Sequence, residues 1–551
     1  MLFPKLEIAQ TLKSYNRHAF MGDLSAGFIV AIVALPLCIA FAIASGLEPD
    51  KGIITGIVAS FLVAIFSGSH VQIAGPSGPF VVIAFGVLHQ AGINGLIIAT
   101  FTAGVMLIIM GRAGLGSLIK FIAYPVIAGF TAGVAILLFT TEFGDMLGLQ
   151  AVAGGNILAK WQAYFSALDT INPYAVILTG GSVLLIMIRV KWLKRVPQSF
   201  LALILATLAV HIFNLPVDTI GSRFKEIAAG FPSPVFPQLS FEIVREMIQP
   251  AMAIALLAAI ESLLSAVVAD GMTGTSHDPK SVLVAQGLAN IGSSLFGGLP
   301  ACAALARTAT NVRNGGRTFV SGVIHALVLA LIALVLGKWA SLIPLCVLGA
   351  ILFVVAYNLF NWPAISAIFK NPRSDIIVLM VTLGITVLVD LSTGVLVGMA
   401  LAGVLFIQRM AAATDVNVVT REFQREAGVP RADDAPPLTV PRGVEVYEIN
   451  GPFFFGAVYK LREAVSLPSK KPRVRMIRMS KVNVMDSTGL HALEELYHRC
   501  KKEGSTLIIS EIHAQPFTAL LKSGLLDRFG EENVTASFED AVQRAQQIVK
   551  M

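Results

Sequence analysis

Apolar segments of about 20 residues recur along the first part of the chain, and they restrict the fold more than any other feature. A segment of this length spans the hydrocarbon layer as a helix. Twelve such segments cover residues 24–45, 52–68, 93–112, 117–140, 173–190, 197–213, 248–268, 280–297, 317–336, 343–360, 374–390 and 392–408. Two shorter pieces, at 77–90 and 304–313, bring the expected total to fourteen membrane segments.

The composition supports a membrane protein with a soluble tail. Of the 551 residues, 55% are hydrophobic and 14% are charged, whereas soluble domains carry about 25% charged residues. Frequent charges and alternating polarity return only after the last apolar segment. We therefore expect an N-terminal segment over 1–23, a membrane domain over 24–410, a linker over 411–442 and a soluble domain over 443–551.

Basic residues gather at the ends of the apolar segments and predict the topology. The net charge of +7 could suggest nucleic acid, but this distribution is the one that membrane orientation requires. With the N-terminus in the cytoplasm, the loops expected there are basic, except for 270–280. The long 214–245 loop has mixed charge, and long loops count less. We expect a multi-pass protein of the inner membrane, embedded in lipid, with both termini cytoplasmic and no nucleic-acid partner.

The cysteines give no sign of a disulfide framework or a metal site. The chain has four cysteines: Cys38, Cys302, Cys346 and Cys500. Their positions show no CxxC spacing, and three of them lie in apolar segments. The sequence also contains no recognisable nucleophile–base set. We therefore expect no metal, no cofactor and no enzymatic activity.

Two Gly/Pro interruptions occupy matching places in the chain. Gly75-Pro76-Ser77-Gly78-Pro79 breaks the first half, and Gly297-Gly298-Leu299-Pro300 breaks the second. Fourteen segments form two sets of seven, and an odd number per set means that the two sets are inverted. Interrupted helices at matching positions mark transporter binding sites, although prolines are common in membrane helices generally. The sequence thus predicts a 7+7 inverted repeat with a site at the two breaks.

The two breaks and a nearby arginine point to an anion as the ligand. A helix that starts inside the membrane leaves its first N–H groups unpaired, with the positive end of its dipole facing the cavity. Ser77 and Gly78 would line one such end, and the backbone from Ala303 to Ala306 the other. Arg307 adds a forked set of donors suited to carboxylates and oxyanions. The alternative is that Arg307 reaches the membrane surface together with Arg313 and Arg317.

A carboxylate, Glu261, lies inside the apolar segment 248–268 without a neighbouring lysine or arginine in the sequence. Ionisable residues within membrane segments are costly and mark functional sites by default. Burial favours the protonated form of such a carboxyl, whereas a nearby Arg307 favours the charged form. Glu261 could therefore carry a proton in one state and release it in another. The alternative is a static Glu261–Arg307 pair that only aligns helices.

The tail has the pattern of a small α/β domain. Strands are expected over Val444–Ile449, Val474–Met479 and Thr506–Ile509, because apolar residues alternate or form short buried runs there. Apolar residues at helical spacing predict an amphipathic helix around 490–500. A last amphipathic helix is expected over Phe538–Val549.

Several motifs, in this order along the chain, resemble the sulfate permease (SulP) family of anion transporters. They are the run Ala34–Gly46, the turn Gly75-Pro76-Ser77, Ile260–Leu264 with Asp270–Gly274, and Ala306-Arg307-Thr308. The resemblance implies the seven-plus-seven inverted repeat shared with nucleobase transporters (UraA-like), divided into a core and a gate and usually assembled as a homodimer. Asp486-Ser487-Thr488-Gly489 resembles the signature loop of a STAS domain, so the tail is expected to be a cytosolic STAS domain.

The resemblance also implies roles for single residues. Phe41, Ser77, the backbone from Ala303 to Leu305, and Arg307 would line the substrate site, and Glu261 would couple transport to protons. Sodium-coupled bicarbonate members have an aspartate at Glu261, a hydroxyl residue at Leu305 and no arginine at Arg307, so sodium coupling is disfavoured here. In soluble STAS proteins the serine at the position of Ser487 is phosphorylated. The alternative is that Ser487 only forms a turn and caps the helix.

The leading hypothesis is proton-coupled uptake of sulfate or a C4-dicarboxylate by an elevator-like motion of core against gate. A bicarbonate or chloride carrier, or an anion exchanger, of the same family is the main alternative. A nucleobase carrier would not need a permanent arginine. A regulatory protein, with a membrane anchor and a cytosolic partner at the STAS domain, would not need Glu261 and Arg307 within interrupted helices.

Overall fold

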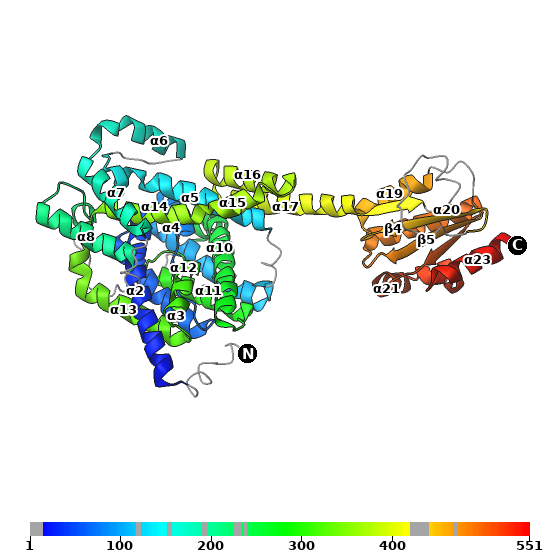
Figure 1. Cartoon of the computed structure of the whole chain (residues 1–551), viewed down its shortest axis with the longest axis horizontal. Coiled ribbons are helices and arrows are strands. Elements are labelled where there is room, and N and C mark those ends of the chain that lie inside the picture. The colour runs from blue at the N-terminus through cyan, green and yellow to red at the C-terminus, as the bar shows by residue number, and fades with distance from the viewer. Residues whose placement is uncertain are drawn as a thin grey trace. The chain divides into compact units, whose positions relative to one another are not determined.

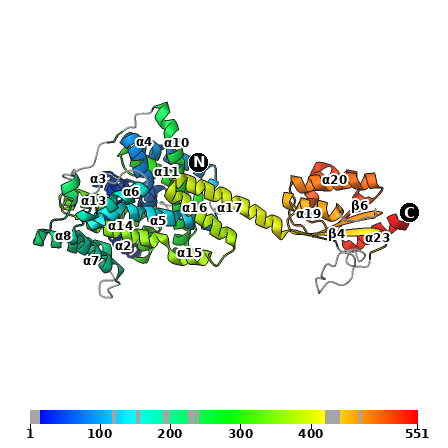
Figure 2. The ribbon, with the colours of Figure 1, turned by 90° about the horizontal axis from the view of Figure 1, so that it is seen from above.

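The computed structural model describes residues 15–116, 123–150, 157–188, 197–224, 234–235, 240–418, 440–466 and 472–550. The chain forms two compact units, Met1–Ala402 and Gly403–Met551. The first consists almost entirely of helices, and the second is a sheet with helices on both faces (Figures 1 and 2). Residues 1–14 of the predicted N-terminal segment, 117–122 and 189–190 of two predicted membrane segments, and 419–439 of the predicted linker lie outside the described residues.

The helices of the first unit follow the predicted apolar segments. The first half contains α2 (Arg17–Ala44), α3 (Pro49–Phe66), α4 (Gly78–Arg112), α5 (Tyr124–Leu147), α6 (Ile157–Ser166), the 3-10 turn η2 (Leu168–Thr170), α7 (Pro173–Met187), α8 (Gln198–Phe213) and α9 (Ile220–Phe224). The second half contains α10 (Phe241–Thr273), α11 (Pro279–Leu295), α12 (Leu305–Arg313), α13 (Phe319–Ala340), α14 (Leu345–Phe360), α15 (Trp362–Ile368), α16 (Arg373–Leu388) and α17 (Leu391–Ala413).

Each of the fourteen predicted segments coincides with a helix or part of one. The segments 77–90 and 93–112 are the two parts of α4, which breaks at Gly92, where a positive φ of 65° suits glycine. Within the described residues, seven helical stretches are long and apolar enough to cross a membrane: Arg17–Ala44, Pro49–Phe66, Gly78–Arg112, Tyr124–Leu147, Phe241–Thr273, Leu345–Ile368 and Thr393–Ala412. The chain is therefore a polytopic helical protein, and the count of fourteen membrane segments stays a prediction.

Some helices differ from expectation because polar residues extend or form them. α10 begins at Phe241 rather than near 248, since its first turns are polar and lengthen the helix beyond its apolar part. The short helices α6, α9 and α15 are not expected from the apolar runs at all. Each is well below the length that spans a bilayer, and so none of them carries the signal used to find membrane helices.

Two short strands join the halves of the first unit. β1 (Ala74–Pro76) pairs antiparallel with β2 (Ala301–Ala303), and Gly75 lies opposite Cys302 at the centre. α4 begins directly after β1, and α12 begins shortly after β2. Since the strands are antiparallel, the helices that follow them leave in opposite directions. α11 of the second half packs against α4 of the first half, and α13 of the second half packs against α3 of the first half. Each of these two contacts is the counterpart of the other when the halves are exchanged. This arrangement is that of an inverted repeat.

Glycines allow a close contact between α4 and α11 in this unit. A Cβ on Gly104 of α4 would lie 2.7 Å from the carbonyl oxygen of Gly287 in α11. A Cβ on Gly287 would lie 2.6 Å from the carbonyl oxygen of Gly104. Small residues let membrane helices approach backbone to backbone, and here they fix α11 against α4, whose first residue lies at one of the two breaks.

The second unit is a five-stranded sheet in the order β3-β4-β5-β6-β7. Its strands are β3 (Asp415–Val418), β4 (Val444–Asn450), β5 (Val474–Lys481), β6 (Thr506–Ser510) and β7 (Val534–Thr535). Its helices are α19 (Phe455–Ser466), α20 (Ser487–Glu503), α21 (Ala514–Ser523), α22 (Leu525–Phe529) and α23 (Phe538–Lys550), with a 3-10 turn η4 (Glu531–Asn533). β3 is antiparallel to β4, and the other neighbours are parallel.

Side-chain alternation along the strands builds two cores in this unit. Tyr447 and Ile477 belong to the core shared with α19 and α20, whereas Val446 and Met476 belong to the core under α23. Successive residues of a strand point to opposite faces, so both faces of the sheet are covered (Figure 2). The predicted strands and the final helix are confirmed. The sheet begins earlier than the expected boundary at 443, because β3 lies within the stretch 411–442. β3 alternates polar and apolar residues over only four positions, directly after α17.

Candidate functional site

The starts of α4 and α12 meet at the β1–β2 pair. Ser77 has an extended backbone and precedes the first residue of α4, and Ala304 does the same for α12. Neither residue caps its helix with a side-chain hydrogen bond. No side-chain cap occupies the first N–H groups of either helix, although Pro79 at the second position of α4 has no N–H to offer. Both helix dipoles present their positive ends at one place. This is the geometry that the two Gly/Pro breaks predict.

Arg307 reaches back from α12 to β1. It is only 3% exposed, and its Nη2 donates to the carbonyl oxygen of Pro76 at 2.7 Å. Within the described part of the chain its Nη1 has no hydrogen-bond partner. Arg307 is therefore not a residue of the membrane surface, in contrast to Arg313, which is exposed. A buried guanidinium with unused donors is costly unless an acceptor joins it, and this geometry favours an anionic ligand.

Glu261 of α10 faces the same two strands from another side. Its Oε2 accepts hydrogen bonds from the Ser77 hydroxyl at 2.9 Å and from the Cys302 thiol at 2.7 Å. Among the ion pairs of the described residues, none joins Glu261 to Arg307. The static pair considered from the sequence is therefore absent in this conformation. Both side chains instead contact the first break, Glu261 through Ser77 and Arg307 through Pro76, and Glu261 also contacts Cys302 of β2.

The backbone donors at the second break differ from the expected set. The N–H of Ala303 donates to the Ser262 hydroxyl at 3.1 Å, and the N–H of Ala304 donates to the carbonyl of Ile73 at 3.2 Å. Both N–H groups thus have acceptors in this conformation, and their direct binding of the ligand stays a prediction. The first N–H groups of α12 proper belong to Leu305 and Ala306, whose side chains are exposed.

Apolar side chains pack against the start of α4. A Cβ on Gly78 would lie 3.6 Å from Phe41 of α2, 3.6 Å from Leu138 of α5 and 3.3 Å from Leu359 of α14. Phe41 is 4% exposed, so its ring is a packed wall of the site. Phe41 thus lies beside the half-helix start, and its role in the substrate site stays a prediction.

Polar side chains from distant helices replace the strand partners that a two-stranded sheet lacks. Asn290 bonds both backbone groups of Ala301 at 2.9 Å. Thr55 accepts from the N–H of Leu299 at 2.7 Å, and Ser60 donates to the carbonyl of Ala74 at 2.5 Å. These residues were missed from the sequence, although a threonine, a serine and an asparagine within apolar segments are a signal that could have found them.

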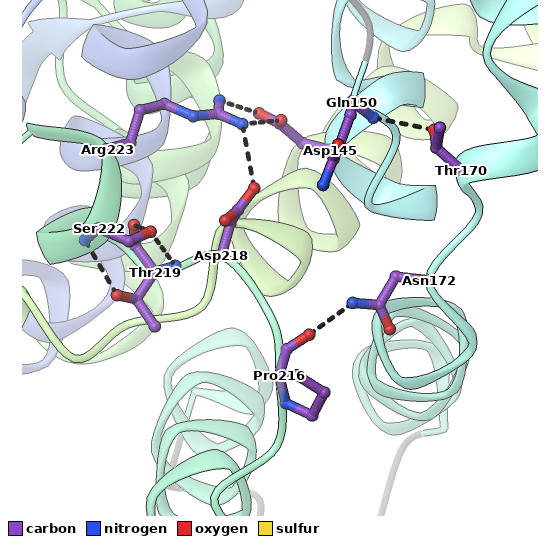
Figure 3. Close-up of polar contacts among 9 residues, drawn as sticks. All are labelled: Asp145, Gln150, Thr170, Asn172, Pro216, Asp218, Thr219, Ser222 and Arg223. Carbon is purple, nitrogen blue, oxygen red and sulfur yellow. Dashed lines mark hydrogen bonds and ion pairs between the residues drawn. The ribbon is translucent and has the colours of Figure 1, made fainter.

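A second polar cluster lies at the C-terminal end of α5 and the N-terminal end of α7 (Figure 3). Arg223 of α9 makes two hydrogen bonds to the carboxylate of Asp145, at 3.1 and 2.8 Å, and lies 3.9 Å from Asp218. Asn172 donates to the carbonyl of Pro216 at 2.5 Å. A cavity of about 210 Å³ adjoins them. This cluster is not predicted from the sequence, because its members come from separate segments. It holds the chain after α8 against α5 and α7.

Ser487 is exposed and stands first in α20. The cap of this helix is its neighbour Asp486, whose carboxylate accepts from the N–H of Gly489 at 2.8 Å. Ser487 itself is therefore not the cap of this helix, and its modification stays a prediction. Among the described residues, no group of three or more His, Cys, Asp or Glu side chains is placed to hold a metal ion.

Comparisons with known proteins agree with the two-unit architecture. Residues 20–382 match the sulfate permease family, and residues 435–541 match the STAS domain. The protein YvdB of Bacillus subtilis (strain 168), which carries a sulfate-transporter name, is 39% identical over 95% of this chain and 97% of its own. The bicarbonate transporter BicA of Picosynechococcus sp. (strain ATCC 27264 / PCC 7002 / PR-6) is 32% identical over 95% of this chain and 94% of its own.

Solved structures show the same fold. The murine anion transporter Slc26a9 superimposes with a TM-score of 0.86 at 19% identity, covering 98% of this chain and 94% of that one. The transmembrane domain of a cyanobacterial BicA gives a TM-score of 0.62 at 30% identity, over 70% of this chain and 98% of that one. The family match, the relatives and the two half-helix starts lead to one conclusion. The chain belongs to the sulfate permease family of anion transporters, and it carries a STAS domain after its transport unit.

Proposed function

We propose that this protein takes up sulfate or a C4-dicarboxylate together with protons, across the inner membrane. The observation that carries the proposal is the buried guanidinium of Arg307, whose Nη1 has no partner among the described residues and lies where two half-helices start. An anion placed there would accept from Nη1 and from the N–H groups of Leu305 and Ala306. The positive ends of two helix dipoles would stabilise it further.

Glu261 supplies the proposed coupling. A charged carboxylate beside Ser77 repels an anion bound at the start of α4, whereas a protonated one does not. Proton binding at Glu261 and anion binding at Arg307 therefore favour each other, and thermodynamic linkage makes this effect reciprocal. Because Glu261 and Arg307 are not paired directly, each is free to respond to its own ligand.

The mechanism we propose is an elevator-like movement of a core against a gate. The core would consist of α2, α3, α4 and α10 to α13, which hold both breaks, and the gate of α5, α7, α8, α14, α16 and α17. Fourteen membrane segments with both termini in the cytoplasm would place the STAS domain in the cytosol. There it could support a homodimer or bind a cytosolic partner through the region of Ser487.

A second candidate is bicarbonate transport. The 32% identity to BicA over nearly the whole chain favours it. Arg307 and Glu261 argue for a different coupling, since the family resemblance implies that sodium-coupled bicarbonate members lack this arginine and have an aspartate in place of the glutamate.

The test is uptake of labelled sulfate, succinate and bicarbonate into proteoliposomes, with and without a pH gradient. We expect Arg307→Ala to abolish uptake and binding of the substrate, because loss of a charge-assisted hydrogen bond weakens binding about tenfold or more. Glu261→Gln should keep binding and lose the response to the gradient. Arg313→Ala, an exposed arginine of the same helix, is the control. Full pH-driven accumulation by Glu261→Gln would remove the coupling role, and normal uptake by Arg307→Ala would remove the anion site.

A further inference from the structure

A larger cavity, of about 590 Å³, lies apart from the two breaks. It is bounded by α4, α5, α6, α10 and the turn between α16 and α17, and it has the size of a small-molecule site. Its polar lining residues are Gln90, Thr140, Thr141, Lys160, Glu246, Gln249, Thr386 and Asp390. We call it the Lys160 cavity. In the predicted topology it lies on the side of the membrane away from the termini.

Lys160 is a buried cation whose charge interacts with the buried carboxylate of Glu142 on α5, although the two form no ion pair. It is 9% exposed, and its Nζ lies 3.3 Å from the hydroxyl of Thr141 and 4.4 Å from the ring centroid of Phe85. Among the ion pairs found in the described residues, none includes Lys160. An ammonium group has three donors, and only one of them has an acceptor here. Burying such a charge is costly unless an anion accompanies it.

The helix that carries Lys160 is held firmly in place. Trp161, the next residue of α6, lies 4.9 Å from Phe143 and 6.3 Å from Phe139, ring centroid to centroid, and both belong to α5. Such aromatic contacts stabilise by about 0.5–1.5 kcal/mol beyond the area that they bury. Lys160 is therefore positioned by its own helix, and it does not swing freely at the surface.

The Lys160 cavity lies further along α4 than the half-helix start. Val82 and Ile83 line it, and they follow Gly78 by about one helical turn. Leu137 of α5 lines it too, whereas the next residue, Leu138, packs against the start of α4. The Lys160 cavity and the start of α4 are thus neighbours along α4 and α5. The side chains of Leu138 and Leu359 lie beside the start of α4.

We propose that the Lys160 cavity is a second anion site, in which the Lys160 ammonium receives a small oxyanion or carboxylate before it reaches Arg307. The hydroxyls of Thr140 and Thr141 and the amides of Gln90 and Gln249 supply neutral donors around it. Two carboxylates also line the cavity. Asp390 already accepts from the N–H of Thr393 at 2.9 Å, and Glu246 is exposed. Their presence favours weak, reversible binding, as a receiving site requires. The place of this site on a route to Arg307 rests on the proposed function.

Fluorescence of the purified full chain tests the site directly, since Trp161 adjoins Lys160. Sulfate and succinate, each titrated at constant ionic strength up to about 50 mM to cover weak binding, should change the emission saturably in the wild type and in Arg307→Ala. The change should vanish in Trp161→Phe and Lys160→Gln and persist in Lys160→Arg. Lys51→Gln, a lysine paired with Asp50 in the first turn of α3, is the control and should respond as the wild type does.

The outcomes separate this site from the proposed function. A saturable change that survives Arg307→Ala and disappears in Lys160→Gln supports the Lys160 site, whether or not Arg307 binds substrate. A response that Lys160→Gln retains, or a wild type that shows none, overturns the proposal. Size-exclusion elution identifies a misfolded Lys160→Gln, in which case Lys160→Arg decides: the site is wrong if this variant binds no anion. In uptake assays, Lys160→Gln should raise KM about tenfold and leave the rate at saturating substrate close to the wild type.

Discussion

The guanidinium of Arg307 occupies the space that a side chain at Gly75 would fill. A Cβ built on Gly75 would lie 2.1 Å from Nη1 of Arg307 and 3.3 Å from its Cζ. The φ of Gly75 is +152°, a backbone conformation that L side chains rarely adopt. Gly75 is thus required both by its own backbone and by an arginine from the other half of the molecule.

The first prediction follows from this contact. Gly75→Ala should displace the Arg307 side chain and lower sulfate or succinate uptake by tenfold or more, close to the loss in Arg307→Ala, since an Arg-to-anion hydrogen bond contributes about 1.5–3 kcal/mol. The double variant should lose less than the two single losses combined, because the displacement of Arg307 is common to both changes and only the backbone strain at residue 75 adds to it. Gly384→Ala is the control, since no atom lies within 4 Å of a Cβ at this position of α16. Additive losses would show that Gly75 acts independently of Arg307.

The second prediction concerns Thr55, which accepts from the N–H of Leu299 through its hydroxyl. Thr55→Val keeps the shape of the side chain and leaves that buried N–H without its acceptor, which costs about 1–3 kcal/mol. We expect a lower melting temperature and slower uptake, because β2 and the start of α12 lose their support. Thr55→Ser should restore both. Equal stability of the valine and serine variants in a thermal unfolding assay would contradict the role of the hydroxyl.

The third prediction is a pH dependence of the STAS unit. Partial burial raises the pKa of Glu503, but hydrogen bonds from Arg499 and Arg475 lower it more, so the pKa lies below its ordinary value. A carboxyl with a lowered pKa contributes stability above its unfolded pKa of about 4.3, and this stability is lost as pH falls through the lower folded pKa. The unit should therefore become less stable below about pH 4.3, and Glu503→Gln should flatten that part of the profile.

Cys500 provides the measurement for this third prediction. It is 1% exposed and is the one cysteine in the sequence of the second unit. Its labelling by 4,4′-dithiodipyridine in the full chain, read by peptide mass and referred to the unfolded chain at the same pH, reports opening of the unit. The same acid-dependent rise in labelling for Glu503→Gln as for the wild type would contradict the assignment.

The sequence predicts the first unit well where the signal is local. Long apolar runs place the helices, and Gly/Pro pairs place the breaks at Gly75–Pro79 and Gly297–Pro300. The separation of Arg307 and Arg313 by six positions suggests that only the latter lies at the surface, and the structure agrees for both side chains. Each of these features depends on neighbours in the chain, so one sequence is enough to find it.

The contacts that complete the site cannot be predicted in the same way. Thr55 bonds Leu299 from 244 residues away, and Ser77 bonds Glu261 across 184 residues. No periodicity identifies such partners. Ala303 and Ala304 were expected to offer free N–H groups, but packing gives each of them an acceptor from another element. Lys160 was overlooked because α6 is short and amphipathic, and only the folded chain shows that its ammonium is buried.

The pairing of β1 with β2 has a consequence for synthesis in the cell. The partner residues Ala74 and Ala303 are 229 positions apart, the difference of their numbers, and unpaired backbone groups within a bilayer are costly. When β1 leaves the ribosome, its partner has not yet been made, and it remains without it until most of the second half has entered the membrane. The first half must therefore wait, incompletely folded, for the second. The transport site is therefore among the last parts of the molecule to form. A chain whose synthesis stops before β2 leaves β1 unpaired in the membrane, where cellular quality control can recognise it.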